Sequence, residues 1–134
     1  MPSRPFDPTP ALTAFLTEHH LASLTTLRAD GSPHVVPVGF SVDVAAGEVR
    51  VITFEGSQKV RNARRGGRAA VSQVDGGRWV TLEGPIRATT DVAEVAAAVA
   101  GYAARYQQPK ERIDRVALVI TIDRVLCSAA LRGA

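Results

Sequence analysis

The sequence predicts a mainly β protein of the α+β class, with six antiparallel strands in a closed or partly closed barrel. Two Asp-Gly pairs, at 30–31 and 75–76, each separate two runs of strand-forming residues, which is a strong hairpin signal. Helical patterns are few: one near the N-terminus, one between strands and one before the last strand. The regular strand and helix alternation of a parallel sheet is absent from the sequence, as is a glycine-rich dinucleotide fingerprint. An antiparallel barrel is therefore favoured.

Runs of β-branched residues, and the turns between them, set the expected strands. These strands span residues 21–28, 34–43, 48–54, 68–74, 79–89 and 116–125. The last strand is an almost continuous apolar run, which is typical of a strand buried on both faces.

Capping residues place the three helices. Thr9-Pro10 begins a short N-terminal helix, and Ser57 begins a helix that ends at Gly66-Gly67. Asp91 begins an alanine-rich helix that runs to about Tyr106. The apolar stripe of that third helix comprises Val92, Val95, Val99 and Tyr102.

Length and composition indicate one soluble domain spanning residues 1–134. The chain has 46% apolar and 22% charged residues, which is ordinary for a globular protein. No stretch approaches the roughly 20 apolar residues that cross a bilayer, and the N-terminus lacks the apolar segment of a signal peptide. We therefore expect a cytoplasmic protein with no membrane partner.

Several other classes of protein find no support in the sequence. Cys127 is the single cysteine and is expected to be a small buried apolar residue. The three histidines lack the spacing of metal ligands, so no metal site is expected, and no nucleophile motif of a hydrolase is present. Five basic residues fall between 59 and 68, but without interleaved aromatics they do not indicate nucleic-acid binding.

The segment from Thr53 to Asn62 is the most informative about function. A strand ends there, Gly56 permits a tight turn, and Ser57 opens a helix whose first N–H groups are able to hold an anion. Lys59 and Asn62 lie three residues apart, so both are placed to reach a phosphate or a ring carbonyl. The alternative interpretation is a capped amphipathic helix with a solvated basic face.

Three segments carry a resemblance to a known family: LTTLRADGSPHVVPVGF (24–40), GSQKVRN (56–62) and WVTLEG (79–84). Together they resemble the pyridoxamine 5'-phosphate oxidase-like superfamily, whose fold is the FMN-binding type of split β-barrel. Within it they are most similar to the actinobacterial flavin/deazaflavin oxidoreductases that use coenzyme F420, in particular the biliverdin reductases of that group. The resemblance covers nearly the whole chain in order and spacing.

The resemblance implies a cofactor groove at the interface of a homodimer. Lys59 would bind the cofactor phosphate, with Ser57, Gln58 and Asn62 beside it. Thr53 would contact the ring or the ribityl chain, and Pro37 and Val38 would line the ring. The partner subunit would contribute Gln73, Arg78 and Trp79; without a cofactor role, Trp79 would be a core or interface aromatic and Gln73 a solvent-facing residue. A homodimer is also expected because the 116–125 strand is too apolar for an exposed edge.

The implied function is hydride transfer from reduced coenzyme F420 to a conjugated organic acceptor, with a tetrapyrrole such as biliverdin as one candidate. No catalytic residue is named, because the cofactor carries the chemical step. Related FMN oxidases carry basic residues where this chain has Pro37-Val38-Gly39, which favours F420 over FMN. Two alternatives stay open: a non-catalytic dimer that binds F420, FMN or haem, and an FMN-dependent pyridoxamine phosphate oxidase-like enzyme.

Overall fold

The structure, a computed structural model, describes residues 6–132. Within that range it contains four helices: α1 (Pro10–Thr17), α2 (Gln58–Arg64), α3 (Val92–Arg105) and α4 (Ala129–Arg132). Its strands are β1 (Ala22–Leu27), β2 (Pro33–Val38), β3 (Ser41–Asp43), β4 (Glu48–Phe54), β5 (Arg68–Asp75), β6 (Arg78–Thr89), β7 (Arg115–Thr121) and β8 (Arg124–Cys127). None of these helices is long and apolar enough to cross a membrane.

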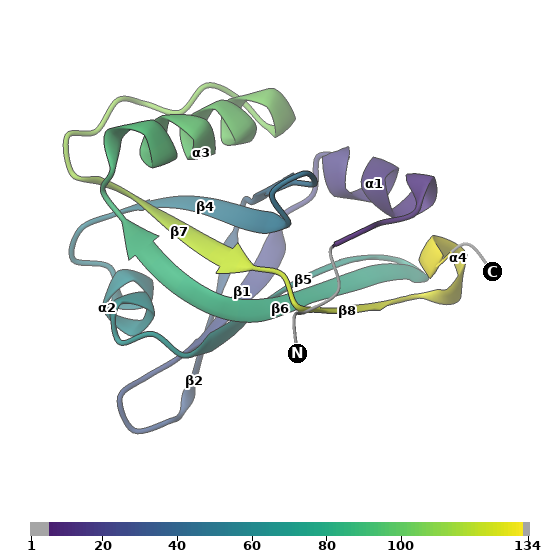
Figure 1. The fold of residues 1–134 in the computed structure, drawn as a ribbon, viewed down its shortest axis with the longest axis horizontal. Coiled ribbons are helices and arrows are strands. Elements are labelled where there is room, and N and C mark those ends of the chain that lie inside the picture. Colours follow the sequence, from purple (N-terminus) through teal and green to yellow (C-terminus); the bar gives the residue numbers. More distant parts are fainter. Residues whose placement is uncertain (1–5, 133–134) are drawn as a thin grey trace.

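All strands belong to one antiparallel sheet in the order β2-β1-β5-β6-β7-β4-β3, with β8 paired to β6. The long, curved β6 joins the two halves of the sheet (Figure 1), because its first part pairs with β5 and β8 and its last part with β7. Gly84 allows this crossing: a Cβ there would lie 1.7 Å from the carbonyl oxygen of Thr121. The sheet is strongly bent but not closed, as in a split barrel.

The prediction of six strands is wrong by two, because two predicted strands are each divided. The 34–43 run is broken between β2 and β3 at Gly39, where a Cβ would lie 2.9 Å from the Tyr102 ring and 3.0 Å from the Tyr106 ring. The 116–125 run is broken between β7 and β8 at residues 122–123, where the backbone turns to bond Gly47 and Glu83. Close packing and long-range bonds therefore divide runs that look continuous in sequence. The short α4 was not predicted.

The predicted helix caps are confirmed. Thr9 Oγ1 accepts from the Leu12 N–H at 3.1 Å, and Asp91 accepts from the Glu94 N–H at 3.0 Å. The apolar stripe of α3 is only partly buried, since Val92 remains 84% exposed. The first residue of the stripe therefore faces solvent rather than the sheet.

One apolar core joins α1 and α4 to the inner sides of the strands. Five consecutive residues of β7, Val116 to Ile120, are buried, which confirms a strand covered on both faces. The same strand lies between β6 and β4, so the argument that it would otherwise form an exposed edge is wrong. Cys127 is buried, as expected.

A buried polar network fastens α3 to the end of the barrel. The Arg105 guanidinium donates to the carbonyl oxygens of Glu18 and Phe40, both at 2.8 Å, and to Gln73 Oε1 at 2.5 Å. Gln73 in turn donates to the Phe15 carbonyl at 2.9 Å. Burial lowers the pKa of Arg105, whose charge is held by neutral oxygens within the described chain.

One side of the sheet is covered by no helix within residues 6–132 (Figure 1). This open sheet face consists of the outward-pointing residues of β1, β2, β5, β6 and β8, and small side chains such as Ser23 and Ser72 lie across it. Its exposed apolar residues are Leu27, Val35, Val74, Trp79 and Leu126. Val74 and Trp79 are direct cross-strand partners, so they form a continuous apolar surface.

Candidate functional site

Three residues predicted for the site, Pro37, Val38 and Lys59, line one pocket of about 270 Å³. We call it the Lys59 pocket. It lies where the end of β2, the outer side of β4 and the start of α2 meet beneath α3. Its other lining residues are Gly39, Ile52, Tyr102, Pro109 and Arg115.

The turn between β4 and α2 places Lys59 in this pocket. Gly56 adopts a φ of +86°, which favours glycine, and the chain then enters α2 at the Ser57 cap. Lys59 Nζ lies 5.8 Å from the centre of the Phe54 ring, and burial lowers the pKa of this ammonium group. Lys59 therefore presents a partly desolvated charge, which favours pairing with an anion.

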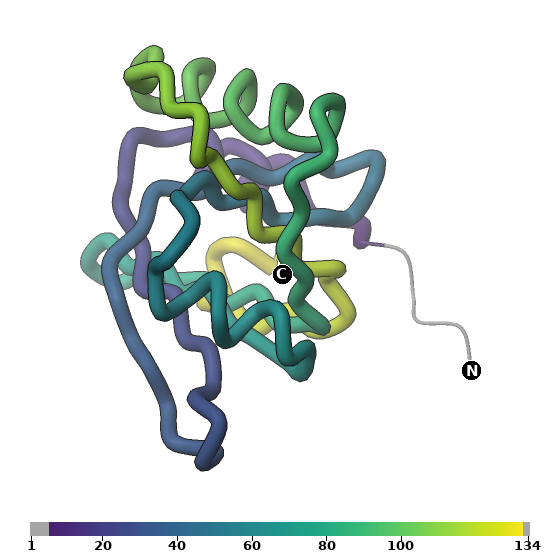
Figure 2. The backbone as a smooth tube through the Cα atoms, turned by 90° about the vertical axis from the view of Figure 1, so that its left-hand side faces the viewer, coloured from purple at the N-terminus to yellow at the C-terminus, as the bar shows by residue number. Residues whose placement is uncertain are grey.

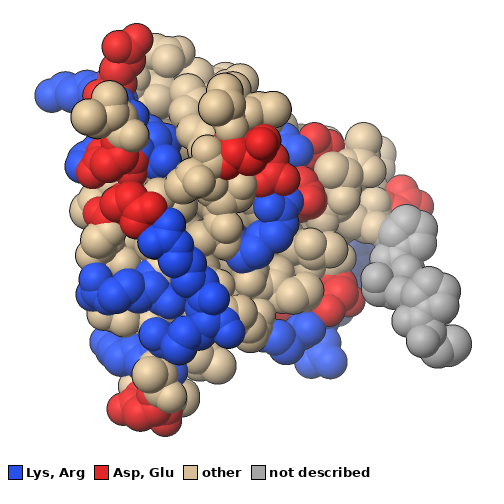
Figure 3. Space-filling view, turned by 60° about the vertical axis from the view of Figure 1, so that its left-hand side comes forward, with Lys and Arg blue, Asp and Glu red and all other residues tan. Residues whose placement is uncertain are grey.

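The surface around the Lys59 pocket carries an excess of positive charge. Within residues 6–132, six nearby cations have no carboxylate within 4 Å: Arg28, Lys59, Arg61, Arg65, Lys110 and Arg115. Several of them instead donate to neutral oxygens, as Arg61 does to Gly56 and Arg65 to Leu27. Figure 3 shows contiguous basic side chains in the lower left of one face. Such a surface attracts anionic ligands.

His34, on the inward side of β2, reflects the same positive environment. Its pKa is lowered by burial and by the charges of Arg28 and Lys59. Its Nδ1 is buried and has no partner among the described residues. The imidazole is therefore held in its neutral form near neutral pH.

Four predicted site residues lie behind the Lys59 pocket rather than lining it. Ser57 Oγ caps α2 by accepting from the Val60 N–H, and the buried Thr53 hydroxyl donates to Ser57. Asn62 is buried and ties α2 to β1 through a 3.0 Å bond to the Thr26 hydroxyl. Gln58 donates to Asn62 at 2.8 Å. These side chains hold Lys59 in position.

The residues expected from the partner subunit lie outside the Lys59 pocket of their own chain. Gln73 is fully buried in the network around Arg105, so it is not the solvent-facing residue that the alternative interpretation described. Trp79 is 39% exposed on the open sheet face. Arg78 donates to both Glu18 and Asp75. Of these three residues, Trp79 combines exposure with a side chain that makes no hydrogen bond to the described chain, so it is the best placed to contact a second molecule.

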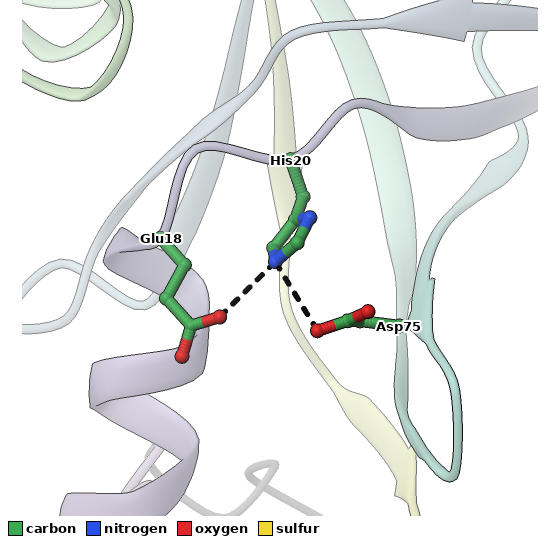
Figure 4. Close-up of side chains that lie close together, drawn as sticks. All are labelled: Glu18, His20 and Asp75. Carbon is green, nitrogen blue, oxygen red and sulfur yellow. Dashed lines mark hydrogen bonds and ion pairs between the residues drawn. The ribbon is translucent and has the colours of Figure 1, made fainter.

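Glu18, His20 and Asp75 form a cluster with the geometry of metal ligands (Figure 4). Their ligand atoms lie within 4.8 Å of one another. Sequence spacing did not reveal the cluster, because it joins two distant segments. The Arg78 guanidinium pairs with both carboxylates, so a cation would have to compete with it. The cluster fastens the segment after α1 to the β5–β6 hairpin.

A separate pocket of about 450 Å³ lies between α1, β3 and α3 and contains no predicted site residue. Both of its cations are already engaged: Arg50 is paired with Asp43 at 3.1 Å and Glu48 at 3.3 Å, and Arg105 donates to the neutral oxygens of the buried network at the end of the barrel. The Lys59 pocket, which retains unpaired charge, is therefore the better candidate for an anionic ligand.

Sequence reasoning missed four residues of the Lys59 pocket: Ile52, Tyr102, Pro109 and Arg115. Tyr102 was visible as part of the α3 stripe, but its position over β2 depends on how the helix docks. Arg115 enters the site because it pairs with Phe54 across β4 and β7. The pairing register of β4 with β7 cannot be predicted from the local sequence.

The unclosed antiparallel sheet, with α2 inserted after β4 and α3 before β7, defines a split β-barrel protein. A family model described as pyridoxamine 5'-phosphate oxidase matches residues 8–127, and the chain belongs to that family. The resemblance seen in the sequence is thereby confirmed.

Comparison with curated proteins and solved structures gives the same family. An F420H2-dependent biliverdin reductase from Mycobacterium tuberculosis is 53% identical over 118 residues, covering 88% of this chain and 86% of that protein. A conserved hypothetical protein of the same organism has a similar structure, with a TM-score of 0.77, 22% identity and coverage of 96% and 89%. A structure described as an F420 reductase gives a TM-score of 0.69 at 24% identity, covering 84% of this chain and 94% of the other. At these identities the two solved structures support the fold.

Proposed function

We propose that this protein is an F420H2-dependent reductase of a conjugated organic acceptor, with a linear tetrapyrrole such as biliverdin as the leading candidate. The observation that carries the proposal is the 53% identity, over 88% of the chain, to an F420H2-dependent biliverdin reductase. Identity at this level over nearly the full length of both proteins supports a shared cofactor and a shared type of reaction.

The Lys59 pocket fits the anionic part of such a cofactor. The partly buried ammonium group of Lys59 would bind the phosphate, and a charge-assisted bond of this kind is worth about 1.5–3 kcal/mol. The cations without carboxylate partners on α2, among them Arg61 and Arg65, would attract the carboxylates of the cofactor tail. Each of those exposed pairs contributes less than about 1 kcal/mol.

Reduced coenzyme F420, when bound, would supply a hydride, and the acceptor would gain that hydride together with a proton from solvent or from a nearby residue. The chain contributes binding and orientation. Pro37 and Val38 offer an apolar wall without charged side chains, which suits a flat ring. The buried Thr53, Ser57 and Asn62 would keep α2, and therefore Lys59, fixed relative to that wall.

A homodimer is part of this proposal. The Lys59 pocket of about 270 Å³ is smaller than the roughly 300–1,000 Å³ of sites for ligands smaller than this cofactor, so a second surface is needed to complete it. The open sheet face supplies a suitable interface, because its apolar residues are exposed and the described part of the chain does not cover them. Trp79 on that face would then lie near the partner's groove.

Turnover tests the proposed function. Purified protein is mixed anaerobically with F420H2 and biliverdin, and the appearance of oxidised F420 is followed by its absorbance. We expect oxidation that depends on both the protein and biliverdin. NADPH and reduced FMN serve as alternative donors in parallel reactions. No F420H2 oxidation with biliverdin or with a panel of other conjugated acceptors would support the non-catalytic alternative.

A further inference from the structure

A second pocket adjoins the Lys59 pocket on the side of α3. After α3 the chain returns to β7 through the loop formed by residues 106–114, the light green segment that leaves α3 in Figure 2. Between this loop and α3 lies a pocket of about 590 Å³, which we call the α3–loop pocket. Its apolar walls are Val95, Val99, Pro109 and Ile113.

The α3–loop pocket presents apolar side chains that the described chain leaves wholly or partly uncovered. Ile113 is fully exposed at the edge of the loop, and Val95 and Val99 are only partly buried. Val95 and Val99 are four residues apart, so they lie on the same side of α3. Because Ile113 is fully exposed, folding buries none of its apolar side chain. Together with Val95 and Val99, which line the same pocket, it is suited to contact an apolar ligand.

The two pockets share a boundary. Pro109 and Arg115 line both of them, so a ligand at one pocket reaches the other past these two residues. The Arg115 guanidinium is held by the backbone carbonyl of Lys110, which fixes the loop at this boundary. A molecule lying in the α3–loop pocket therefore ends beside the apolar wall of the Lys59 pocket.

The charges at the α3–loop pocket are mostly positive. Three cations line it, Lys110, Arg112 and Arg115, with Glu111 as the single carboxylate among the lining residues. Arg112 is paired with Asp114 at 2.8 and 3.0 Å and lies over the Phe54 ring. Lys110 is exposed and has no carboxylate partner within the described residues. Arg115 also lacks a carboxylate partner, but it is less exposed and its guanidinium is held by the Lys110 carbonyl, so Lys110 is the cation most accessible to a ligand.

We propose that the α3–loop pocket binds the acceptor, and that it selects an extended, conjugated apolar molecule carrying carboxylate groups. This inference rests on the proposed function and adds the position and chemical class of the substrate. The apolar walls would cover the conjugated part, and Lys110 would pair with a carboxylate. An oligoglutamate cofactor tail has no apolar part to match Val95, Val99 and Ile113, so the cofactor is a poorer match to this pocket.

Binding measured without turnover tests this assignment. Biliverdin, which carries two carboxylates, and its dimethyl ester are titrated separately into cofactor-free protein, and binding is followed by tetrapyrrole absorbance. We expect Ile113→Ser to raise the dissociation constants of both ligands about fivefold, because it removes apolar contact. Lys110→Glu should raise that of biliverdin by roughly threefold to tenfold and leave that of the ester nearly unchanged.

Matched controls separate local from general effects. Val44→Ser alters another exposed apolar residue, and Arg132→Glu reverses another exposed charge; both lie away from the two pockets. Neither should change the affinity for biliverdin. Coenzyme F420 is titrated into the same variants and should bind Ile113→Ser as it binds wild type.

The outcomes also distinguish this inference from the proposed function. Wild-type dissociation constants for biliverdin in both Ile113→Ser and Lys110→Glu would overturn the acceptor site, even if the enzyme reduces biliverdin with F420H2. Weaker F420 binding in both variants, with biliverdin unaffected, would assign the pocket to the cofactor instead. Failure of turnover with normal biliverdin binding to the wild type would instead count against the reductase function.

Discussion

Arg78 and Glu18 form a two-pronged ion pair in which the guanidinium nitrogens lie 2.7 and 2.9 Å from the two carboxylate oxygens. The pair joins the segment after α1 to the start of β6. Asp75, at the end of β5, also accepts a hydrogen bond from Arg78, at 2.6 Å. Hydrogen bonds from Arg78 and then His20 lower the pKa of Glu18 to about 2, from an ordinary value of 4.5.

Because of this ion pair, we expect the free energy of unfolding to decrease at acid pH. Because the pKa of Glu18 is lower in the folded state, its stabilising contribution is complete above about pH 4.5 and is lost as the pH falls toward 2. Glu18→Gln should flatten that part of the profile of unfolding free energy against pH, measured by urea denaturation. Glu111→Gln, at an exposed carboxylate with no ion pair in the described chain, is the control. If the free energy of unfolding of Glu18→Gln decreases at acid pH as it does in the wild type, the ion pair of Glu18 is not its cause.

The network around Arg105 implies that removing its guanidinium group strongly destabilises the protein. Arg105→Met keeps much of the side-chain volume but leaves Gln73 Oε1 without its donor. It also removes one of the two hydrogen bonds that the Glu18 and Phe40 carbonyls each accept, the others coming from His20 N–H and the Tyr106 hydroxyl. We expect the free energy of unfolding to fall by about 2–4 kcal/mol, because one buried acceptor is left unsatisfied and two further charge-assisted hydrogen bonds are lost. Arg124→Met, at an exposed arginine, should shift the denaturation midpoint far less. Equal effects of the two substitutions would show that the network is not stabilising.

We expect substitution of Lys59 to weaken the binding of coenzyme F420 and to leave the fold intact. Lys59→Ala should raise the dissociation constant of coenzyme F420 about tenfold to hundredfold, because one charge-assisted bond to phosphate is removed. Turnover at saturating cofactor should stay near normal, since the anchor binds ground state and transition state alike. Titration, circular dichroism and melting temperature are compared with Arg132→Ala. Wild-type affinity for F420 in Lys59→Ala would remove Lys59 from the site.

The open sheet face predicts the oligomeric state. We expect a homodimer at micromolar concentration by light scattering, and a shift to monomer in Val74→Glu, because the new charge would be buried in the interface. Val92→Glu introduces the same charge at an even more exposed residue on α3 and should remain dimeric. A wild-type monomer that binds cofactor with full affinity would contradict the shared groove.

Local chemistry explains which parts of the fold could be predicted from the sequence. The caps at Thr9, Ser57 and Asp91 act within one helical turn, so their side chains show where each helix starts. The breaks after β2 and β7 could not be predicted, because they depend on contacts with residues far along the chain. Gly39 illustrates this: its need for a small side chain comes from Tyr102 and Tyr106 on α3.

In the candidate site, too, the features that depend on long-range contacts could not be predicted from the sequence. Lys59 follows a visible turn and cap, so the sequence was enough to single it out. Asn62 has the spacing of a ligand-binding residue, but the docking of α2 onto β1 turns it inward to Thr26. Ile113 gave no signal in the sequence, because its exposure depends on the path of the loop. The cytoplasmic location stays a prediction.

The choice of cofactor tests the central claim most directly. Coenzyme F420 and FMN are each titrated by calorimetry into the same preparation of cofactor-free wild-type protein at one salt concentration. Pro37-Val38-Gly39 would offer no basic side chain to the cofactor ring, and the surface around Lys59 carries positive charge with no carboxylate partner among the described residues. We therefore predict that F420 binds more tightly than FMN. Tighter binding of FMN, or no binding of F420, would contradict the account.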